Sequence, residues 1–214
     1  MRKILLLLCI ISITFSAKAQ LFGKHWDKGS YYDTAGHKHI GLISWVAPQT
    51  SFLTGTGDEI YFKTDKTAEE LKIKSDSLNS FLVETDTATY SYVVSKNKIL
   101  EKKPILQILF DNTPKLYASL TTRKASGSMG SVGFGVSYLH SEYYFGDDHN
   151  SITKLDKKNF IEVMSKIMAD KPETVERIKS KRLRIGDMDA LLYFYKYGLM
   201  PPAPAPDPFS GPDH

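Results

Sequence analysis

Cysteine is nearly absent from this chain, because Cys9 is the single cysteine among its 214 residues. Cys9 lies in the apolar run 4–15, so the sequence after that run contains no thiol. Without thiols, residues 20–214 cannot form a disulfide, bind zinc through thiolates or use a cysteine nucleophile.

Motifs that identify a reaction are also missing. The serine-nucleophile elbow needs Gly-x-Ser-x-Gly, but Ser126 occupies the first glycine position of the stretch 126–130. The glycines Gly130, Gly133 and Gly135 do not match the phosphate-binding pattern Gly-x-Gly-x-x-Gly, and no predicted helix follows them. The sequence therefore names no catalytic residue and no cofactor, which favours a protein that is not an enzyme.

The first 19 residues contain no acidic side chain and have the three parts of an export signal. Arg2 and Lys3 are positive, residues 4–15 are almost wholly apolar, and residues 17–19 (Ala-Lys-Ala) form a small-x-small cleavage site. The apolar run of about 12 residues is shorter than the about 20 that a membrane-spanning helix needs. We therefore expect cleavage after residue 19, no transmembrane span afterwards, and an exported protein that is periplasmic or secreted.

Loss of residues 1–19 removes apparent positive charge. Lys+Arg falls from 28 to 25, against 24 Asp+Glu, so the remaining chain is nearly neutral. A nucleic-acid partner, which needs clustered positive charge, is therefore not expected.

The length that remains after residue 19 suits one domain. We expect a single domain at 20–198 and a proline-rich, disordered tail at 199–214.

Short β-branched and aromatic segments separated by turn residues dominate residues 37–155, which is typical of antiparallel strands joined by hairpins. The Ser/Gly-rich stretch 122–131 has almost no apolar content and predicts a mobile surface loop. We expect strands at 37–46, 59–63, 71–74, 81–84, 89–95, 104–110, 115–121, 132–138, 142–145 and 151–155.

After residue 155 the apolar period changes from two to about 3.6 residues, which indicates helices. Asp156 as an N-cap predicts a helix that ends near Ala169, and Pro172 begins a second one. Asp187 precedes a third helix that stops at Gly198. A block of antiparallel strands followed by about three C-terminal helices predicts an α+β fold.

This layout resembles a group of uncharacterised exported proteins from Bacteroidota-type bacteria. The residues that carry the resemblance are Ala-Lys-Ala before Gln20, the early strand around 40–43, the central hairpin 104–117 and the closing helical sequence 191–195. The resemblance implies the same order of strands and helices, and it implies no activity.

Histidines and acidic residues supply candidates for a metal site. His37 and His39 are two apart on a predicted strand, so both imidazoles point to one face. Asp147, Asp148 and His149 could add ligands only if the fold brought them close. Asp147, Asp148 and Asn150 fall short of the oxygen-ligand spacing of a calcium loop. An exposed polar face at the start of a strand also explains the two histidines, and we favour it over a metal site.

Aromatic residues supply the candidate ligand site. Tyr138, Tyr143, Tyr144 and Phe145 cluster in one glycine-rich hairpin region, where amphipathic rings can contact a glycan or a peptide. About half of these rings are expected to pack in the core instead, because alternate residues of a strand face inward.

We expect a non-enzymatic binding or interaction module of the cell envelope, with a protein, peptide or glycan partner. The alternative is a metal-dependent or hydrolytic enzyme whose site assembles only in three dimensions.

Overall fold

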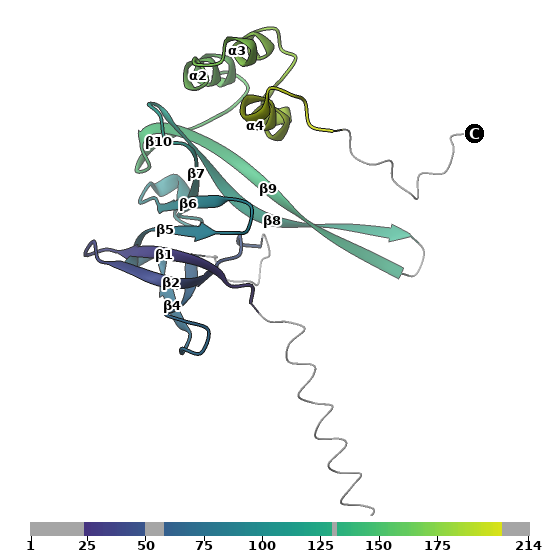
Figure 1. Ribbon diagram of the computed structural model, residues 1–214. Helices are drawn as coiled ribbons and strands as arrows, with labels where there is room; N and C mark the ends of the chain where they lie inside the picture. The colour runs from purple at the N-terminus through teal and green to yellow at the C-terminus, as the bar shows by residue number, and fades with distance from the viewer. Residues whose placement is uncertain (1–23, 50–57, 130–131, 203–214) are drawn as a thin grey trace, which may run out of the picture.

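The computed structural model of the protein describes residues 24–49, 58–129 and 132–202 (Figure 1). Within these ranges, ten strands form one antiparallel sheet and three α-helices follow it. The predicted α+β fold is confirmed. The elements are β1 (Asp27–Asp33), β2 (Lys38–Ser44), β3 (Glu59–Lys63), β4 (Leu71–Lys74), β5 (Leu78–Glu84), β6 (Thr89–Val94), β7 (Ile105–Phe110), β8 (Lys115–Met129), β9 (Val132–Asp148), β10 (Ser151–Lys154), α2 (Phe160–Ile167), α3 (Pro172–Lys179) and α4 (Met188–Tyr197).

The strand order requires one half of the sheet to curl. The order is β10-β9-β8-β7-β6-β5-β1-β2-β3-β4, so three strands separate β4 from β5. The short turn Ser75–Ser77 nevertheless joins these two strands directly. Such a connection reaches about 14 Å, whereas β4 and β5 would lie about 19 Å apart in a flat sheet. Strands β1 to β5 must therefore bend round until β4 approaches β5.

One core cluster joins the strands of the curled half. Phe81 and Tyr92 stack with ring centroids 4.5 Å apart, and Tyr31 meets Phe62 edge-on at 4.9 Å. Burial raises the pKa of Tyr92 to about 12. Aliphatic side chains from five strands complete this cluster, namely Ile43, Ile60, Leu78, Val83, Val94 and Ile105.

Strand β1 was not predicted from the sequence, because its residues show no regular apolar alternation. It lies between β2 and β5, and Gly29 permits that position. A Cβ atom at Gly29 would lie 2.2 Å from the carbonyl oxygen of Leu82 on β5. Gly41 on β2 is equally restricted, with the Lys63 carbonyl oxygen 2.1 Å from its Cβ position. Tertiary pairing rather than local propensity therefore defines this part of the sheet.

The three helices lie beside the opposite end of the sheet, next to β7, β8 and β10 (Figure 1). Leu116 of β8 is fully buried in their core, and Phe110 of β7 contacts Tyr195 of α4 edge-on with ring centroids 4.9 Å apart. The apolar spacing predicted for amphipathic helices is present. The buried helical-layer side chains are Leu155, Phe160, Val163, Met164, Ile167, Met168, Ile178, Leu183, Met188, Leu191 and Phe194.

The predicted helix ends differ from the observed ones by about one turn at most. The Asp156 carboxylate accepts the N–H groups of Lys158 and Asn159, at 2.7 and 3.1 Å, so it closes the turn that precedes α2. Gly198 follows α4 with φ 72°, and its N–H donates to the Phe194 carbonyl at 2.8 Å. Glycine suits this left-handed helix end because it has no Cβ.

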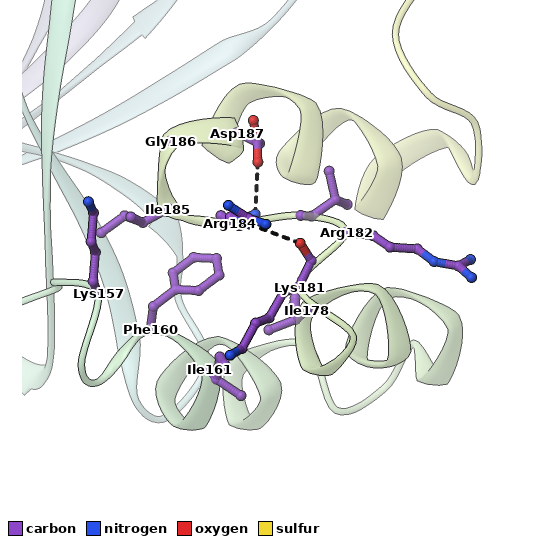
Figure 2. A pocket seen from close by; sticks show the side chains of 11 residues that line it. Lys157, Phe160, Ile161, Ile178, Lys181, Arg182, Arg184, Ile185, Gly186 and Asp187 are labelled. Carbon is purple, nitrogen blue, oxygen red and sulfur yellow. Dashed lines mark hydrogen bonds between the residues drawn. The ribbon is translucent and has the colours of Figure 1, made fainter.

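A lysine takes the equivalent position after α3. Lys181 has φ 60°, its N–H donates to the Ile178 carbonyl at 3.0 Å, and the Arg182 N–H donates to the Arg177 carbonyl at 3.0 Å. These two bonds define a Schellman C-cap, whose left-handed residue is usually glycine. The segment that follows passes Phe160 of α2 on its way to α4 (Figure 2).

The loop predicted at 122–131 is wrong for the described residues of that stretch. β8 continues to Met129, and β9 begins at Val132 and includes both strands that were predicted separately at 132–138 and 142–145. The two strands pair without a register shift along their whole length. Backbone pairing in a hairpin needs no apolar face, so a Ser/Gly-rich composition does not exclude strands.

No helix in the described ranges is long and apolar enough to cross a membrane. The predicted export signal at 1–19 and residues 203–214 of the predicted tail lie outside the described residues.

Candidate functional site

The hairpin of β8 and β9 extends past the neighbouring strands of the sheet (Figure 1). β7 pairs with β8 only as far as Ala118, and β10 pairs with β9 only as far as Tyr144. Beyond these positions β8 and β9 pair with each other, ending at Met129 opposite Val132. We call residues 119–129 and 132–143 the ribbon.

The two edges of the ribbon differ. On β8, the Thr122 N–H donates to the Pro48 carbonyl at 2.8 Å, so an earlier segment of the chain lies along this edge. On β9, the Leu155 N–H donates to the Tyr143 carbonyl at 2.8 Å, at the base of the ribbon. From there to the tip, no strand of the described ranges pairs with the outer edge of β9. The β9 edge is therefore the open one.

The open edge presents a regular row of backbone groups. In an antiparallel strand, the N–H and C=O of one residue point to the same side, and successive residues alternate. Tyr143 directs its carbonyl outward, and the register has no shift, so the odd-numbered residues before it also point outward. These residues are Gly133, Gly135, Ser137, Leu139 and Ser141.

Apolar side chains are exposed on both faces in the middle of the ribbon. Tyr138 is 48% exposed and Leu139 is 58% exposed, and as neighbours on one strand they lie on opposite faces. His140 is half-buried, and its burial, together with the nearby charge of Arg123, lowers its pKa. A ligand at this edge would therefore meet free backbone groups flanked by apolar contacts.

The four predicted aromatic site residues separate into different environments. Tyr144 is buried in a core cluster with Tyr117, and Tyr143 and Phe145 pack against the helical core. Burial raises the pKa of Tyr143 and of Tyr144. Of the four rings, Tyr138 is the exposed one. They do not form one aromatic surface, because alternate residues of β9 face opposite sides.

Both predicted histidines contact the carboxylate of Asp33, which was not among the predicted site residues. Asp33 Oδ2 lies 3.1 Å from His37 Nδ1 and 3.3 Å from His39 Nε2. The His39 ring also stacks on Tyr31, with centroids 4.5 Å apart. Asp33 precedes the turn between β1 and β2, so it approaches the histidines through hairpin pairing rather than through sequence spacing.

Asp33 also organises its own turn. Its Oδ1 accepts the His37 N–H at 2.9 Å, its carbonyl oxygen accepts the Gly36 N–H at 3.0 Å, and Asn79 Nδ2 donates to that carbonyl at 2.9 Å. The His37 N–H is the largest cause that lowers the pKa of Asp33 to about 2, and the two imidazoles contribute further. This carboxylate therefore stabilises a turn, with both histidines as partners.

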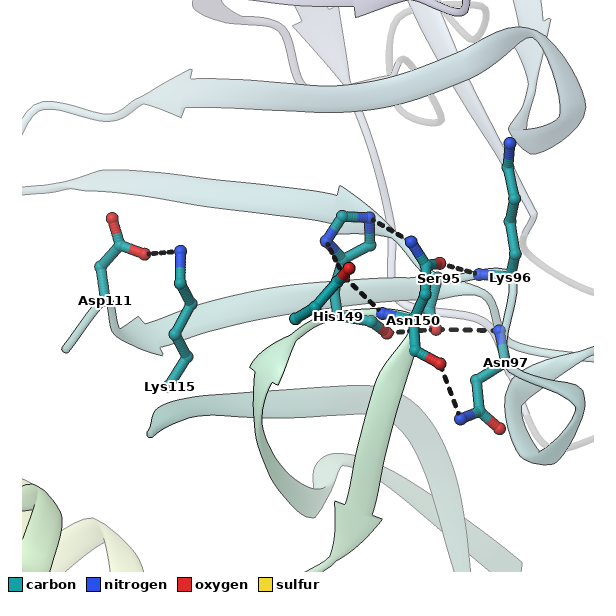
Figure 3. Close-up of polar contacts among 8 residues, drawn as sticks. Ser95, Lys96, Asn97, Asp111, Lys115, His149 and Asn150 are labelled. Carbon is teal, nitrogen blue, oxygen red and sulfur yellow. Dashed lines mark hydrogen bonds and ion pairs between the residues drawn. The ribbon is translucent and has the colours of Figure 1, made fainter. Parts of the chain in front are cut away.

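The predicted acidic cluster lies on a different hairpin, the turn between β9 and β10 (Figure 3). Asp148 Oδ1 lies 3.2 Å from His149 Nδ1 and accepts the Asn150 N–H at 2.9 Å. Ser95 Oγ donates to the His149 carbonyl at 2.5 Å, and the Lys96 N–H donates to Asn150 Oδ1 at 2.7 Å. These bonds hold the β9–β10 turn against the end of β6.

The fold does not bring the two predicted halves of a metal site together. Asp147 and Asp148 line a small hollow with Phe145 and Glu162, far along the sheet order from His37 and His39. Among residues 24–49, 58–129 and 132–202, no group of three or more His, Cys, Asp or Glu side chains has an arrangement that could hold a metal ion.

Two further features of the structure were not predicted from the sequence. The open edge is a backbone property that follows from strand pairing, which composition does not reveal. A run of cationic residues begins in the last turn of α3 and continues past its end. It was visible in the sequence, but the nearly neutral charge of the whole chain concealed it. The run contains Arg177, Lys179, Lys181, Arg182 and Arg184, and no acidic residue lies between them.

Comparisons of this chain with protein-family models, with curated proteins and with solved structures found no match.

Proposed function

We propose that this protein is a non-enzymatic interaction module of the cell envelope, which binds an extended peptide segment of a partner protein along the open edge of β9. The row of outward backbone groups from Gly133 to Ser141 is the observation that supports this most. A peptide that adds a strand to such an edge gains main-chain hydrogen bonds, and side chains beside the edge add selectivity.

The other edges of the sheet support the proposal by contrast. Proteins discourage unwanted strand addition with lysines, prolines, bulges or very short edge strands. Terminal strand β4 has Lys72 and Lys74, and terminal strand β10 is only four residues long. The outward positions of β9 from residue 133 to 141 are glycine, serine and leucine, without a register shift. The β9 edge thus lacks the devices that the terminal edges possess.

A peptide fits this edge better than a glycan does. Glycan binding relies on flat aromatic rings that are open to solvent, and of the four candidate rings only Tyr138 is exposed. The main feature of the edge is its backbone, which another extended backbone matches in spacing and polarity. Leu139 and Tyr138 then provide apolar contacts on the two faces.

Site-specific photocrosslinking in the producing cell tests the proposal. A photoreactive amino acid at Leu139 should crosslink to a partner segment that is recovered and identified by mass spectrometry. The same group at Ser77, in the turn between β4 and β5, is the matched surface control and should not crosslink to that segment. Binding of the identified peptide to the purified protein is then measured by titration.

Two substitutions at one position distinguish backbone pairing from side-chain contact. Ser137→Pro removes an outward N–H and places a ring on the edge, so it should weaken peptide binding by about tenfold or more. Ser137→Ala keeps the N–H and should bind normally. Equal binding by both variants would show that the peptide does not pair with this edge.

The proposed compartment is outside the cytoplasm, either periplasmic or secreted. N-terminal sequencing of the protein purified from its producing cell should begin at Gln20. A chain that begins at Met1 and remains in the cytoplasm would contradict this part of the proposal.

A further inference from the structure

A hollow of ≈ 780 Å³ lies between α2, the end of α3 and the segment that leads to α4 (Figure 2). Its volume falls in the range of about 300–1,000 Å³ that is typical of small-molecule sites. The floor is apolar, because Phe160, Ile178 and Leu183 belong to the buried helical core and Ile161 and Ile185 pack against it. A ligand in the hollow would therefore cover apolar surface.

The rim of this hollow is cationic. Lys157, Lys181, Arg182 and Arg184 line it, and none of the ion pairs in the described part of the chain involves them. Asp187 is the single carboxylate among the lining residues, and its Oδ2 accepts the backbone N–H of Arg184 at 3.0 Å. Arg184 Nε donates to the Lys181 carbonyl at 3.2 Å, which holds the Arg184 side chain against the backbone at Lys181.

Figure 2 separates the cations that face the floor from one that does not. The Lys181 side chain extends toward Ile161, and the Arg184 side chain lies over Phe160. The side chain of Arg182, in the same segment, extends away from both apolar residues. Lys179, an exposed cation of the same cationic run, is not among the residues that line the hollow.

The left-handed backbone conformation of Lys181 lowers the stability of the folded protein. An L-residue in the left-handed conformation is less stable than glycine there, and glycine would make the same two C-cap hydrogen bonds. Non-glycine residues in strained conformations cluster at functional sites, so Lys181 is a candidate for a functional role. The ammonium group is what lysine adds to this position, and it lies at the rim of the hollow.

We infer that this hollow binds an anionic amphiphile, whose carboxylate or phosphate head group contacts Lys181 and Arg184 while its hydrocarbon chain covers the floor formed by Phe160 and Ile161. Charge complementarity selects the head group, and burial of apolar area adds to the affinity. This inference does not rest on the proposed function, because the ribbon and the hollow share no residue.

The chemistry predicts which probes bind. Dodecanoate and dodecyl phosphate, titrated below their micelle concentrations into the full-length protein, should each bind at one saturable site. Inorganic phosphate lacks the chain and dodecyl maltoside lacks the charge, so both should bind much more weakly. A preference between dodecanoate and dodecyl phosphate identifies the head group. Equal affinity for dodecyl maltoside, or for inorganic phosphate, would overturn the inference.

Three variants complete the experiment. Arg184→Gln and Lys181→Gly should each weaken dodecanoate or dodecyl phosphate binding by about tenfold, the effect of one charged hydrogen bond. Lys181→Gly relieves the left-handed lysine, so its loss of binding cannot come from a failure to fold. Lys179→Gln, which removes an exposed cation outside the hollow, is the matched control and should bind normally. Equal weakening by Lys179→Gln and Arg184→Gln would show a general charge effect and contradict a site in the hollow.

Discussion

Two helix ends with opposite residue choices give a quantitative prediction. Lys181 and Gly198 both adopt the left-handed conformation, with φ 60° and 72°. That conformation costs an L-residue about 1–2 kcal/mol, while glycine loses about 0.5–1 kcal/mol more backbone entropy on folding. Lys181→Gly should therefore stabilise the protein by about 0.5–1 kcal/mol. In a chain of this size, that change raises the melting temperature by about 1–4 °C.

The reciprocal substitution should have the opposite sign. A Cβ at Gly198 would meet no heavy atom within 4 Å, so Gly198→Lys introduces backbone strain without a steric clash. Its melting temperature should fall by about the amount that Lys181→Gly gains. Lys181→Ala, which removes the charge but keeps the strain, should melt within about 1 °C of the parent. Calorimetric melting of the three variants checks the prediction, and equal melting of Lys181→Gly and Lys181→Ala would refute it.

Three further substitutions test the fold. The lowered pKa of Asp33, about 2, means that its carboxylate stabilises the native protein fully above pH about 4 and that this stabilisation is lost as the pH falls toward 2. Asp33→Asn removes it, so the free energies of unfolding of parent and variant, measured by denaturant titration, should differ at neutral pH and converge in acid. Gly41→Ala places a Cβ 2.1 Å from the Lys63 carbonyl and should destabilise by about 1–3 kcal/mol, measured as a lower denaturation midpoint; an unchanged midpoint would contradict the pairing of β2 with β3. Leu191→Ala, at a fully buried position of α4, should cost about 2–5 kcal/mol in the same assay, and a cost below 1 kcal/mol would place α4 outside the core.

The helical part of the fold was predictable from the sequence because its signals are local. Pro172 begins α3 and Gly198 follows α4, as expected from helix-end preferences. The apolar stripe that includes Met164 and Ile167 indicates its buried face without knowledge of its neighbours.

The curled half and the ribbon were harder to predict because pairing between distant segments defines them. β1 becomes a strand since Gly29 lets the Leu82 backbone approach, a contact between residues far apart in sequence. The ribbon has no apolar alternation through residues 122–129, so composition indicated a loop where hairpin pairing gives strands.

The candidate site could be predicted only in part from the sequence, for the same reason. The sequence selected His37 and His39 but not Asp33, which joins them across a turn. It selected Tyr138 together with Tyr144, although the first is exposed and the second is buried. Residue type indicates which chemistry is available, whereas strand order decides which side chains share a face and which backbone groups remain open.

Residue-resolved amide hydrogen exchange tests the open β9 edge most directly. In the free protein, the outward amides of Ser137, Leu139 and Ser141 should exchange quickly, while those of Tyr138 and His140, which face β8, should exchange slowly. Saturation with the crosslinked partner peptide should slow the three outward amides and leave the inward ones unchanged. Uniform exchange along β9 in the free protein, or outward amides that the peptide does not protect, would contradict binding by strand addition.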